Sequence, residues 1–382
     1  MLKPQTLDEL AEALQRPASH SRTISLEGNA SKRLMAGPTE SADEYVSTAC
    51  LQRVLDYEPH DLTISVEAGL PWRQLTSLLA EHRQMIPLDP PFAPFATVGG
   101  VVASNSSGPR RRLHGTARDL VIGMTFVTLA GKQVKSGGMV VKNVAGLDMA
   151  KLMIGSFGTL AAIGIVNFKV LPAPEVERSF LLPFDSAATA IAARDRILNG
   201  VLQPSALDLL NPAAGAAIGN RTWLLALRAG GNSAAVDRYE RELSPLAAGV
   251  AFEGDRHDSL WTYLQEMTPA FLSQHQNGAV VRVSCTLKEL QTVMESYPGP
   301  ALARAGSGVC YGYFERTEAA AIWLSSAVKR GWKAVLEYSP EEWKNDLEMW
   351  PAPGGDIEIM RRVKKLFDPE NLLNRGRLYR RI

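Results

Sequence analysis

The chain is poor in cysteine, in net charge and in long apolar runs, and each shortage excludes a class of protein. Cys50, Cys285 and Cys310 are widely spaced and contain no CxxC pair, so they cannot by themselves build a zinc knuckle, an iron–sulfur cluster or a disulfide scaffold. A formal net charge of +1 provides no general attraction to nucleic acid or to an anionic membrane. No window approaches the roughly eighteen apolar residues of a membrane-spanning helix, and the first residues lack the apolar core of a secretory signal. These absences favour a globular protein of the cytoplasm.

The length of 382 residues suggests about two domains, and Ala173-Pro174 is the predicted boundary between them. Before it, Thr6 and Glu9 form a capping box that predicts a helix running to Arg16. We further expect a strand at Leu62–Ala68, a helix after Pro71, strands ending at Leu129 and spanning 132–136, a short helix over 148–154 and a long strand ending at Pro172.

Residues 175–340 alternate between helical and strand patterns, which predicts an antiparallel sheet with helices on one face. The expected helices cover 187–198, 233–246, 287–295 and 317–330, and the expected strands cover 222–228, 279–285, 309–315 and 333–338. A basic helix over Asp356–Phe367 follows.

The most unusual stretch is Thr97–Asp119, TVGGVVASNSSGPRRRLHGTARD, which is crowded with glycine, serine and asparagine. Glycine lets a backbone come within hydrogen-bonding distance of a large flat molecule, and serine and asparagine add short donors and acceptors. This composition predicts that the stretch lies along a nucleotide-like cofactor. A glycine- and serine-rich surface loop is the alternative.

Three segments together resemble a known family. They are PFATVGGVVASNSSGPRRRLHGTARDLVIGM at 94–124, VVKNVAGLDMAKLMIGSFGTLAAI at 140–163 and FDPENLLNRGRLY at 367–379. In order and spacing they resemble the FAD-binding flavoproteins of the PCMH or vanillyl-alcohol-oxidase type, and most of all their glycolate oxidase E-subunit branch. The resemblance implies an α+β fold: a two-subdomain FAD-binding lobe over 1–172, a ferredoxin-like α+β cap over 175–340 and a C-terminal segment over 341–382 that returns to the lobe.

The resemblance also implies a cofactor site with noncovalent FAD. Gly28, Asn29, Ala30, Ser31 and Lys32 occupy the position of a glycine-rich phosphate loop in which two of the usual glycines are replaced. Asn29 tolerates a left-handed backbone better than Ala30 does. The remaining implied FAD contacts are Pro90, Thr97, Gly99, Gly100, Ser104, Asn105, Ser107, Gly108, Gly115, Arg118, Gly158, Ala162, Ile163 and Asn374.

Several of these residues have structural alternatives. Arg118 could instead form an ion pair with Asp119, and Arg377 could either anchor the C-terminal tail or form a surface salt bridge. The phosphate loop, where some relatives carry a tethering histidine, contains none, so noncovalent FAD is expected. His114 is expected to pack or to form hydrogen bonds rather than to tether FAD. Val98, Val101 and Val102 are expected in the core, and the cluster Arg361, Arg362, Lys364 and Lys365 on a solvated helix face.

The cap contributes little recognisable chemistry. His257 and His275 lack HxH or HExxH spacing, so no metal site is expected. Arginine suits a substrate carboxylate because it can donate two parallel hydrogen bonds. The candidate substrate contacts are Arg282, Tyr311, Tyr313 and Arg316, with a structural role as the alternative, and no catalytic base can be assigned.

Three functions remain open at this point. The first is an FAD-dependent component of a glycolate oxidase-like complex that oxidises a 2-hydroxy acid, glycolate to glyoxylate or D-lactate, with electrons passing through partner subunits. The second is a non-catalytic FAD-binding or assembly subunit, which the absence of a metal cluster, a cysteine cluster and an evident base favours for the single chain. The third is a stand-alone FAD-dependent alcohol oxidoreductase. The implied partners are a catalytic FAD subunit and an iron–sulfur subunit, through which a cytoplasmic protein would reach the inner membrane.

Overall fold

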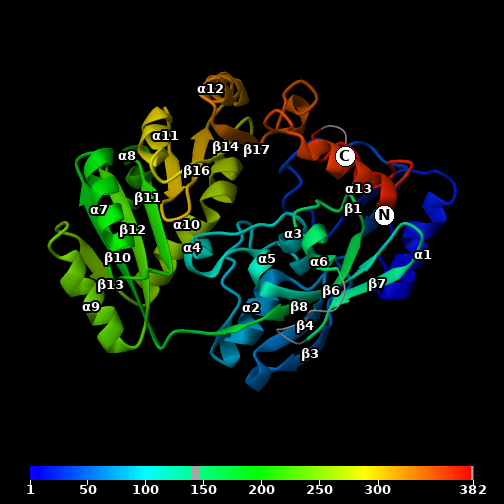
Figure 1. Ribbon diagram of the computed structural model, residues 1–382, viewed down its shortest axis with the longest axis horizontal. Coiled ribbons are helices and arrows are strands. Elements are labelled where there is room, and N and C mark those ends of the chain that lie inside the picture. Colours follow the sequence, from blue (N-terminus) through cyan, green and yellow to red (C-terminus); the bar gives the residue numbers. More distant parts are fainter. Residues whose placement is uncertain (140–146, 380–381) are drawn as a thin grey trace. The chain divides into compact units, whose positions relative to one another are not determined.

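The computed structural model describes residues 1–139, 147–379 and 382 (Figure 1). Segment 140–146, the first part of the resemblance motif at 140–163, lies outside the described residues. The chain forms two compact units. The first unit comprises residues 1–107, 115–173 and 352–382, and the second comprises 108–114 and 174–351. Within the described residues, no helix is long and apolar enough to cross a membrane.

The first unit begins with a small parallel pair of strands under a helix. Helix α1, Leu7–Ala18, starts as predicted: Thr6 Oγ1 accepts a hydrogen bond from Glu9 N at 3.2 Å, and the Glu9 carboxylate accepts from Gln5 N at 2.7 Å. Strands β1, Ile24–Glu27, and β2, Glu44–Ser47, pair in parallel. Because β1 ends at the phosphate loop, this small sheet determines where that loop begins.

A five-stranded antiparallel sheet forms the rest of the first unit. Its order is β3-β4-β8-β6-β7. The expected strand at 62–68 is confirmed as β4, although Leu62 itself takes a left-handed turn with φ of 55°. The bounds are β3 Val54–Glu58, β4 Thr63–Glu67, β6 Val121–Val127, β7 Gln133–Gly137 and β8 Ala162–Lys169.

Short elements connect these strands, and the C-terminal segment returns to them. Figure 1 shows helix α13 (red) on the side of the first unit where β1 lies, and Leu373 bridges Ile24 in parallel. The remaining elements of this unit are η1 Pro59–Asp61, α2 Trp72–Glu81, β5 Gln84–Met85 paired with β9 Leu171–Pro172, α3 Val98–Ala103, α5 Ala117–Leu120, α6 Ala150–Met153 and α13 Asp356–Phe367.

The Thr97–Asp119 stretch is not one continuous surface. It divides among three short helices, α3, α4 (Arg111–His114) and α5, and its middle part, 108–114, belongs to the second unit. Val98, Val101 and Val102 are buried, as expected. The glycines of α3 therefore stand on a helix whose opposite face is core, which holds their backbone in a fixed position.

The second unit is built on an eight-stranded antiparallel sheet in the order β13-β10-β12-β11-β15-β16-β14-β17. The predicted strands are present as β12, β14, β16 and β17, but β10, β11, β13 and β15 had no sequence prediction. The bounds are β10 Val176–Phe184, β11 Ala206–Leu210, β12 Trp223–Gly231, β13 Val250–Phe252, β14 Ala279–Ser284, β15 Ala301–Arg304, β16 Val309–Phe314 and β17 Lys333–Tyr338.

Helices cover both faces of this sheet, so the expectation of helices on one face only is wrong. On one face the apolar side chains of α7, α9, α11 and α12 join a single core with the strands. On the other lies α10, a long helix that had no sequence prediction: its Trp261 Nε1 donates to Ser179 Oγ at 2.9 Å on β10. The helix bounds are α7 Ala187–Asn199, α8 Pro212–Gly215, η2 Ala216–Ile218, α9 Ser233–Leu243, α10 Asp255–Gln274, α11 Leu290–Ser296, α12 Thr317–Lys329 and η3 Glu341–Trp343.

Candidate functional site

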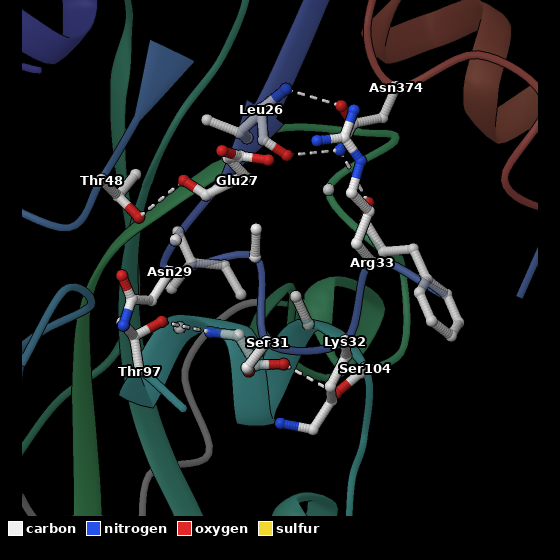
Figure 2. Close-up of a pocket in the computed structure, with 18 of the residues that line it drawn as sticks. Leu26, Glu27, Asn29, Ser31, Lys32, Arg33, Thr48, Thr97, Ser104 and Asn374 are labelled. Atoms are coloured by element: carbon white, nitrogen blue, oxygen red, sulfur yellow. Dashed lines mark hydrogen bonds between the residues drawn. The ribbon is translucent and has the colours of Figure 1, made fainter. Parts of the chain in front are cut away.

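A pocket opens in the first unit where four segments meet: the end of β1 with its following loop, helix α3, the turn that leads into β8, and the C-terminal tail (Figure 2). It is lined by Ser25, Leu26, Glu27, Gly28, Asn29, Ala30, Ser31, Lys32, Arg33, Thr39, Thr48, Thr97, Gly99, Gly100, Ala103, Ser104, Phe157, Gly158, Ala161, Ile163, Asn374 and Arg377.

The loop after β1 presents consecutive amide groups to this pocket. Ala30 has a left-handed backbone with φ of 52°. The amide N–H groups of Asn29, Ala30 and Ser31 donate no hydrogen bond within the described part of the chain. Successive N–H groups at such a left-handed turn form a concave nest that binds anions. The loop is therefore suited to a phosphate group, with the Lys32 side chain next along the chain.

Glycine is required where this loop meets α3. A Cβ added to Gly28 would overlap Thr97 Oγ1, and one added to Gly99 would lie 2.8 Å from Ala68 Cβ. Thr97 Oγ1 accepts a hydrogen bond from Gly100 N at 3.2 Å and so caps α3. At Gly100 only Thr97 Oγ1, at 3.1 Å, would be near an added Cβ. Gly28 and Gly99 thus allow close packing, whereas Gly100 leaves room at the pocket wall.

The C-terminal tail fixes two walls of the pocket through Asn374. Its Oδ1 accepts a hydrogen bond from Leu26 N at 2.6 Å, and its Nδ2 donates to Leu26 O and Phe157 O, each at 2.9 Å. A Cβ on Gly158 would lie 2.8 Å from Asn374 Nδ2, so the turn must carry glycine there. Asn374 therefore holds the end of β1 and the turn before β8 at a set separation.

Arg377 extends this fastening to the far side of the phosphate loop. Its guanidinium donates to Met35 O at 2.6 Å, Gly37 O at 2.9 Å and Thr39 Oγ1 at 2.9 Å, and it lies over the Phe157 ring at 5.8 Å. The side chain is buried, so it anchors the tail inside the fold.

Lys364 is also buried, which corrects the expectation that it shares a solvated helix face with its basic neighbours. Its Nζ donates to Thr159 O at 2.7 Å, Leu373 O at 2.9 Å and Asp368 Oδ2 at 2.7 Å. Burial lowers the pKa of Lys364, and the Asp368 carboxylate acts in the opposite direction. This lysine joins α13 to the turn before β8.

The structure places only part of the predicted cofactor set around the pocket. The predicted residues that line it are Gly28, Asn29, Ala30, Ser31, Lys32, Thr97, Gly99, Gly100, Ser104, Gly158, Ile163 and Asn374. Pro90, Asn105, Ser107, Gly108, Gly115, Arg118 and Ala162 are not among its lining residues, and any contact they make with a cofactor stays a prediction.

Gly115 and Arg118 lie beside Asp119, at the turn that begins α5. Gly115 has φ of 79°, and a Cβ there would overlap the Asp119 carboxylate. That carboxylate accepts from Thr116 N at 2.8 Å, and within the described part of the chain no ion pair joins it to Arg118. Gly115 thus serves the turn that begins α5.

Sequence reasoning missed ten lining residues: Ser25, Leu26, Glu27, Arg33, Thr39, Thr48, Ala103, Phe157, Ala161 and, as a lining residue, Arg377. Phe157 has a left-handed backbone with φ of 52°, beside Gly158. In the sequence, the motif SFGT was the one indication of this tight turn.

The predicted substrate residues lie in the second unit, where Arg282 and Tyr313 contact other polar side chains. Arg282 Nε pairs with Glu337 Oε1 at 2.9 Å, and the Tyr313 hydroxyl lies 3.1 Å from Thr268 Oγ1. Tyr311 is buried near Arg304, and Arg316 is exposed at the start of α12. Their role as substrate contacts stays a prediction.

The two cap histidines have structural neighbours. His257 Nδ1 lies 2.8 Å from Ser179 Oγ, and the ring of His275 packs on Phe271 with 4.5 Å between centroids. Over the residues that the structure describes, no group of three or more His, Cys, Asp or Glu side chains could hold a metal ion.

An anion nest, glycine-enabled close packing and a mixed polar and apolar wall define a pocket for a phosphate-bearing cofactor. Residues 1–137 match the family described as FAD binding domain, and residues 352–378 match FAD linked oxidases, C-terminal domain. The second match contains Lys364, Asn374 and Arg377, the residues that fasten the tail to the pocket. The chain therefore carries an FAD binding domain and the C-terminal domain of the FAD linked oxidases, as FAD-linked oxidoreductases do, and its cofactor is FAD.

The curated relatives of this chain include glycolate oxidase subunits and D-lactate dehydrogenases. The chain is 35% identical over 171 residues to the glycolate oxidase subunit GlcE of Escherichia coli, a match that covers 44% of this chain and 48% of that protein, so it spans about half of that relative. It is 24% identical over 419 residues to the glycolate oxidase subunit GlcD of Bacillus subtilis, covering 99% of this chain and 88% of that protein. A D-lactate dehydrogenase of Archaeoglobus fulgidus is also 24% identical, with 100% and 91% covered.

Solved structures agree on the fold. Alkyldihydroxyacetonephosphate synthase superposes with a TM-score of 0.74 at 18% identity, over 97% of this chain and 76% of that one. The 4-ethylphenol oxidase from Gulosibacter chungangensis superposes with a TM-score of 0.71 at 13% identity, over 98% and 88%. The predicted α+β fold is confirmed by these neighbours.

Proposed function

We propose that this chain is the FAD-binding component of a glycolate oxidase-like complex that oxidises a small 2-hydroxy acid, glycolate or D-lactate, to the 2-oxo acid. The observation that carries the proposal is that most residues lining the pocket come from the segments that match the FAD binding domain and the FAD linked oxidase C-terminal domain, in a chain that is similar to the GlcE subunit. FAD, when bound, supplies the hydride acceptor that oxidation of a 2-hydroxy acid requires.

The chain's own residues hold the cofactor without a covalent bond. The Asn29–Ser31 amides bind the diphosphate, Lys32 supplies positive charge, and Gly99 and Gly100 give α3 a bare surface against the cofactor. Residues 28–32 contain no histidine to tether it. The tail, through Asn374 and Arg377, keeps the loop in its binding shape.

The proposed partners are a catalytic FAD subunit and an iron–sulfur subunit that carry electrons onward, within the cytoplasm or at the inner membrane.

A second candidate is an FAD-holding subunit that does not itself oxidise the acid. Arg282 is one of the candidate carboxylate contacts, and its guanidinium is already paired with Glu337 at 2.9 Å and donates to Ser284 Oγ at 3.0 Å. An arginine committed to two internal partners is a poor anchor for a substrate carboxylate, which would have to displace them. Chemistry would then fall to the catalytic partner.

One experiment separates the two candidates. The chain is purified alone, its flavin absorbance is recorded, and glycolate or D-lactate is added without oxygen. Bleaching of the flavin band supports oxidation by this chain and rejects the holding-only function, whereas an unchanged band that bleaches once the catalytic partner is added supports the holding function. Gly100→Trp is the control, because an indole at the open wall should abolish flavin binding. A colourless wild-type protein that takes up no added FAD would contradict both candidates.

A further inference from the structure

Glu27 is an acidic side chain in a pocket that should hold a diphosphate. It is the last residue of β1 and lines the pocket half-buried, and its backbone carbonyl accepts a hydrogen bond from Thr48 N at 2.9 Å. Its carboxylate makes no hydrogen bond or ion pair within the part of the chain that the structure describes. A negative charge without a partner is thus available to a ligand.

Lys32 and Arg33 both line the pocket and carry positive charge. Figure 2 shows Glu27 on the same side as Thr48, while Lys32 and Ser104 lie on the opposite side of the pocket. The amides of Asn29, Ala30 and Ser31 connect the two sides along the loop. The amide nest and Lys32 therefore form an anion-binding end away from Glu27, while Figure 2 shows the Arg33 side chain reaching toward Asn374 on the side where Glu27 lies.

The chemistry of a carboxylate decides which ligand groups can lie against Glu27. An ionised carboxylate only accepts hydrogen bonds, and a phosphate oxygen offers it no proton. Hydroxyl and N–H donors bind it strongly, because hydrogen bonds to an ionised acceptor are stronger than neutral ones. FAD carries such uncharged donors on both sides of its diphosphate: ribose hydroxyls and the adenine amino group on one side, ribityl hydroxyls and the flavin N–H on the other.

We propose that Glu27 accepts hydrogen bonds from uncharged hydroxyl or N–H donors of FAD and so sets the direction in which the cofactor lies, with the diphosphate at the Lys32 end. The inference rests on the proposed cofactor site and assigns Glu27 as a positioning and specificity residue within it. An acid here also selects against a second phosphate at that end of the ligand, because the like charges would repel.

The test measures binding rather than turnover. The full chain is stripped of flavin, and the affinities for FAD, ADP and FMN are measured by titration calorimetry for the wild type, Glu27→Gln and Glu27→Ala. The matched control is Glu58→Gln, which removes the same charge from an exposed side chain on β3. Equal thermal unfolding of wild type and Glu27→Gln, which is nearly isosteric, verifies that the comparison concerns the pocket.

We expect FAD to bind at least tenfold more weakly to Glu27→Ala, several-fold more weakly to Glu27→Gln and unchanged to Glu58→Gln. A loss shared by FAD and ADP places the donors on the adenosine half, and a loss shared by FAD and FMN places them on the flavin half. Unchanged binding by both Glu27 variants overturns the inference. So does tighter binding by Glu27→Gln that fades as salt is raised, because that result means Glu27 repels the diphosphate. If the wild type binds neither FAD nor ADP, the proposed site itself is wrong, which is a separate failure.

Discussion

The contact between Gly28 and Thr97 should be measurable as a coupling free energy. Gly28 precedes the amide nest and Thr97 caps α3, so this contact joins two walls of the pocket. A Cβ at position 28 would occupy the place of Thr97 Oγ1. Gly28 does not have a positive φ, so alanine is acceptable to the backbone and the substitution tests the contact alone.

The expected magnitude follows from what the hydroxyl does. If Gly28→Ala pushes Thr97 Oγ1 away, α3 loses its cap, which costs about 1 kcal/mol of unfolding free energy. Thr97→Ala removes the same hydroxyl and should cost about the same. The double variant then loses about 1 kcal/mol rather than about 2, because the cap can be lost only once, and the coupling is about 1 kcal/mol.

Urea unfolding of the four proteins, followed by circular dichroism, gives the cycle. Hydrogen exchange at the Gly100 amide gives an independent reading, because that N–H donates to Thr97 Oγ1. Exchange should quicken equally in both single variants and no further in the double variant. Additive unfolding free energies, or an unchanged Gly100 amide in Gly28→Ala, would refute the reasoning and show that the loop moves instead of the threonine.

Three further perturbations test other parts of the structure. Ala30→Gly should raise the unfolding free energy by about 0.5–1 kcal/mol. A left-handed backbone costs a non-glycine residue about 1–2 kcal/mol, and the greater flexibility of glycine in the unfolded chain offsets part of this gain. The control Ala13→Gly, within α1, should lower the unfolding free energy by about 1 kcal/mol in the same denaturation assay. In Arg377→Lys the lysine cannot donate to all the acceptors of the arginine, so FAD binding measured by titration should weaken about tenfold, a loss of about 1.4 kcal/mol. The control Arg375→Lys keeps the ion pair with Glu40 and should leave FAD binding unchanged. Equal effects at both positions would contradict the anchoring role of Arg377. Burial and, secondly, the Arg228 charge lower the pKa of His257. As pH falls, the unfolded chain therefore takes up a proton before the folded one, and stability should decline below about pH 6.5. His257→Gln should flatten this decline in unfolding curves recorded between about pH 5 and 8, and an unaltered slope would show that other groups cause the decline.

Local patterns predicted the elements whose signals are contained in a few neighbouring residues. The capping box at Thr6 and the alternation at 62–68 correspond to α1 and β4 because capping and period-two burial are local effects. Helix α10 carried a signal that was overlooked: Leu260, Trp261, Leu264 and Met267 recur at helical spacing and are buried, although Pro269 and many polar residues interrupt the pattern.

The site was predictable where backbone shape is written in the sequence, and not where distant segments meet. The loop at 28–32 and the glycines of α3 line the pocket, as their composition indicated. Thr39 and Thr48 line the pocket because the chain after the phosphate loop returns to pair β2 with β1 in parallel. The residues next to Thr39 and Thr48 in the sequence give no indication of a pocket. Arg377 left two roles open, since a single arginine in a sequence does not show whether its partners are carbonyls or carboxylates.

The C-terminal tail also dictates when the flavin can be loaded. Asn374 hydrogen-bonds Leu26 from 348 residues further along the chain, and Leu372 O accepts from Ile24 N. A ribosome therefore releases the phosphate loop long before it makes the residues that close the pocket around it. Cofactor insertion must follow translation, and a message truncated before Asn374 should yield a protein whose cap is assembled but whose flavin pocket stays open.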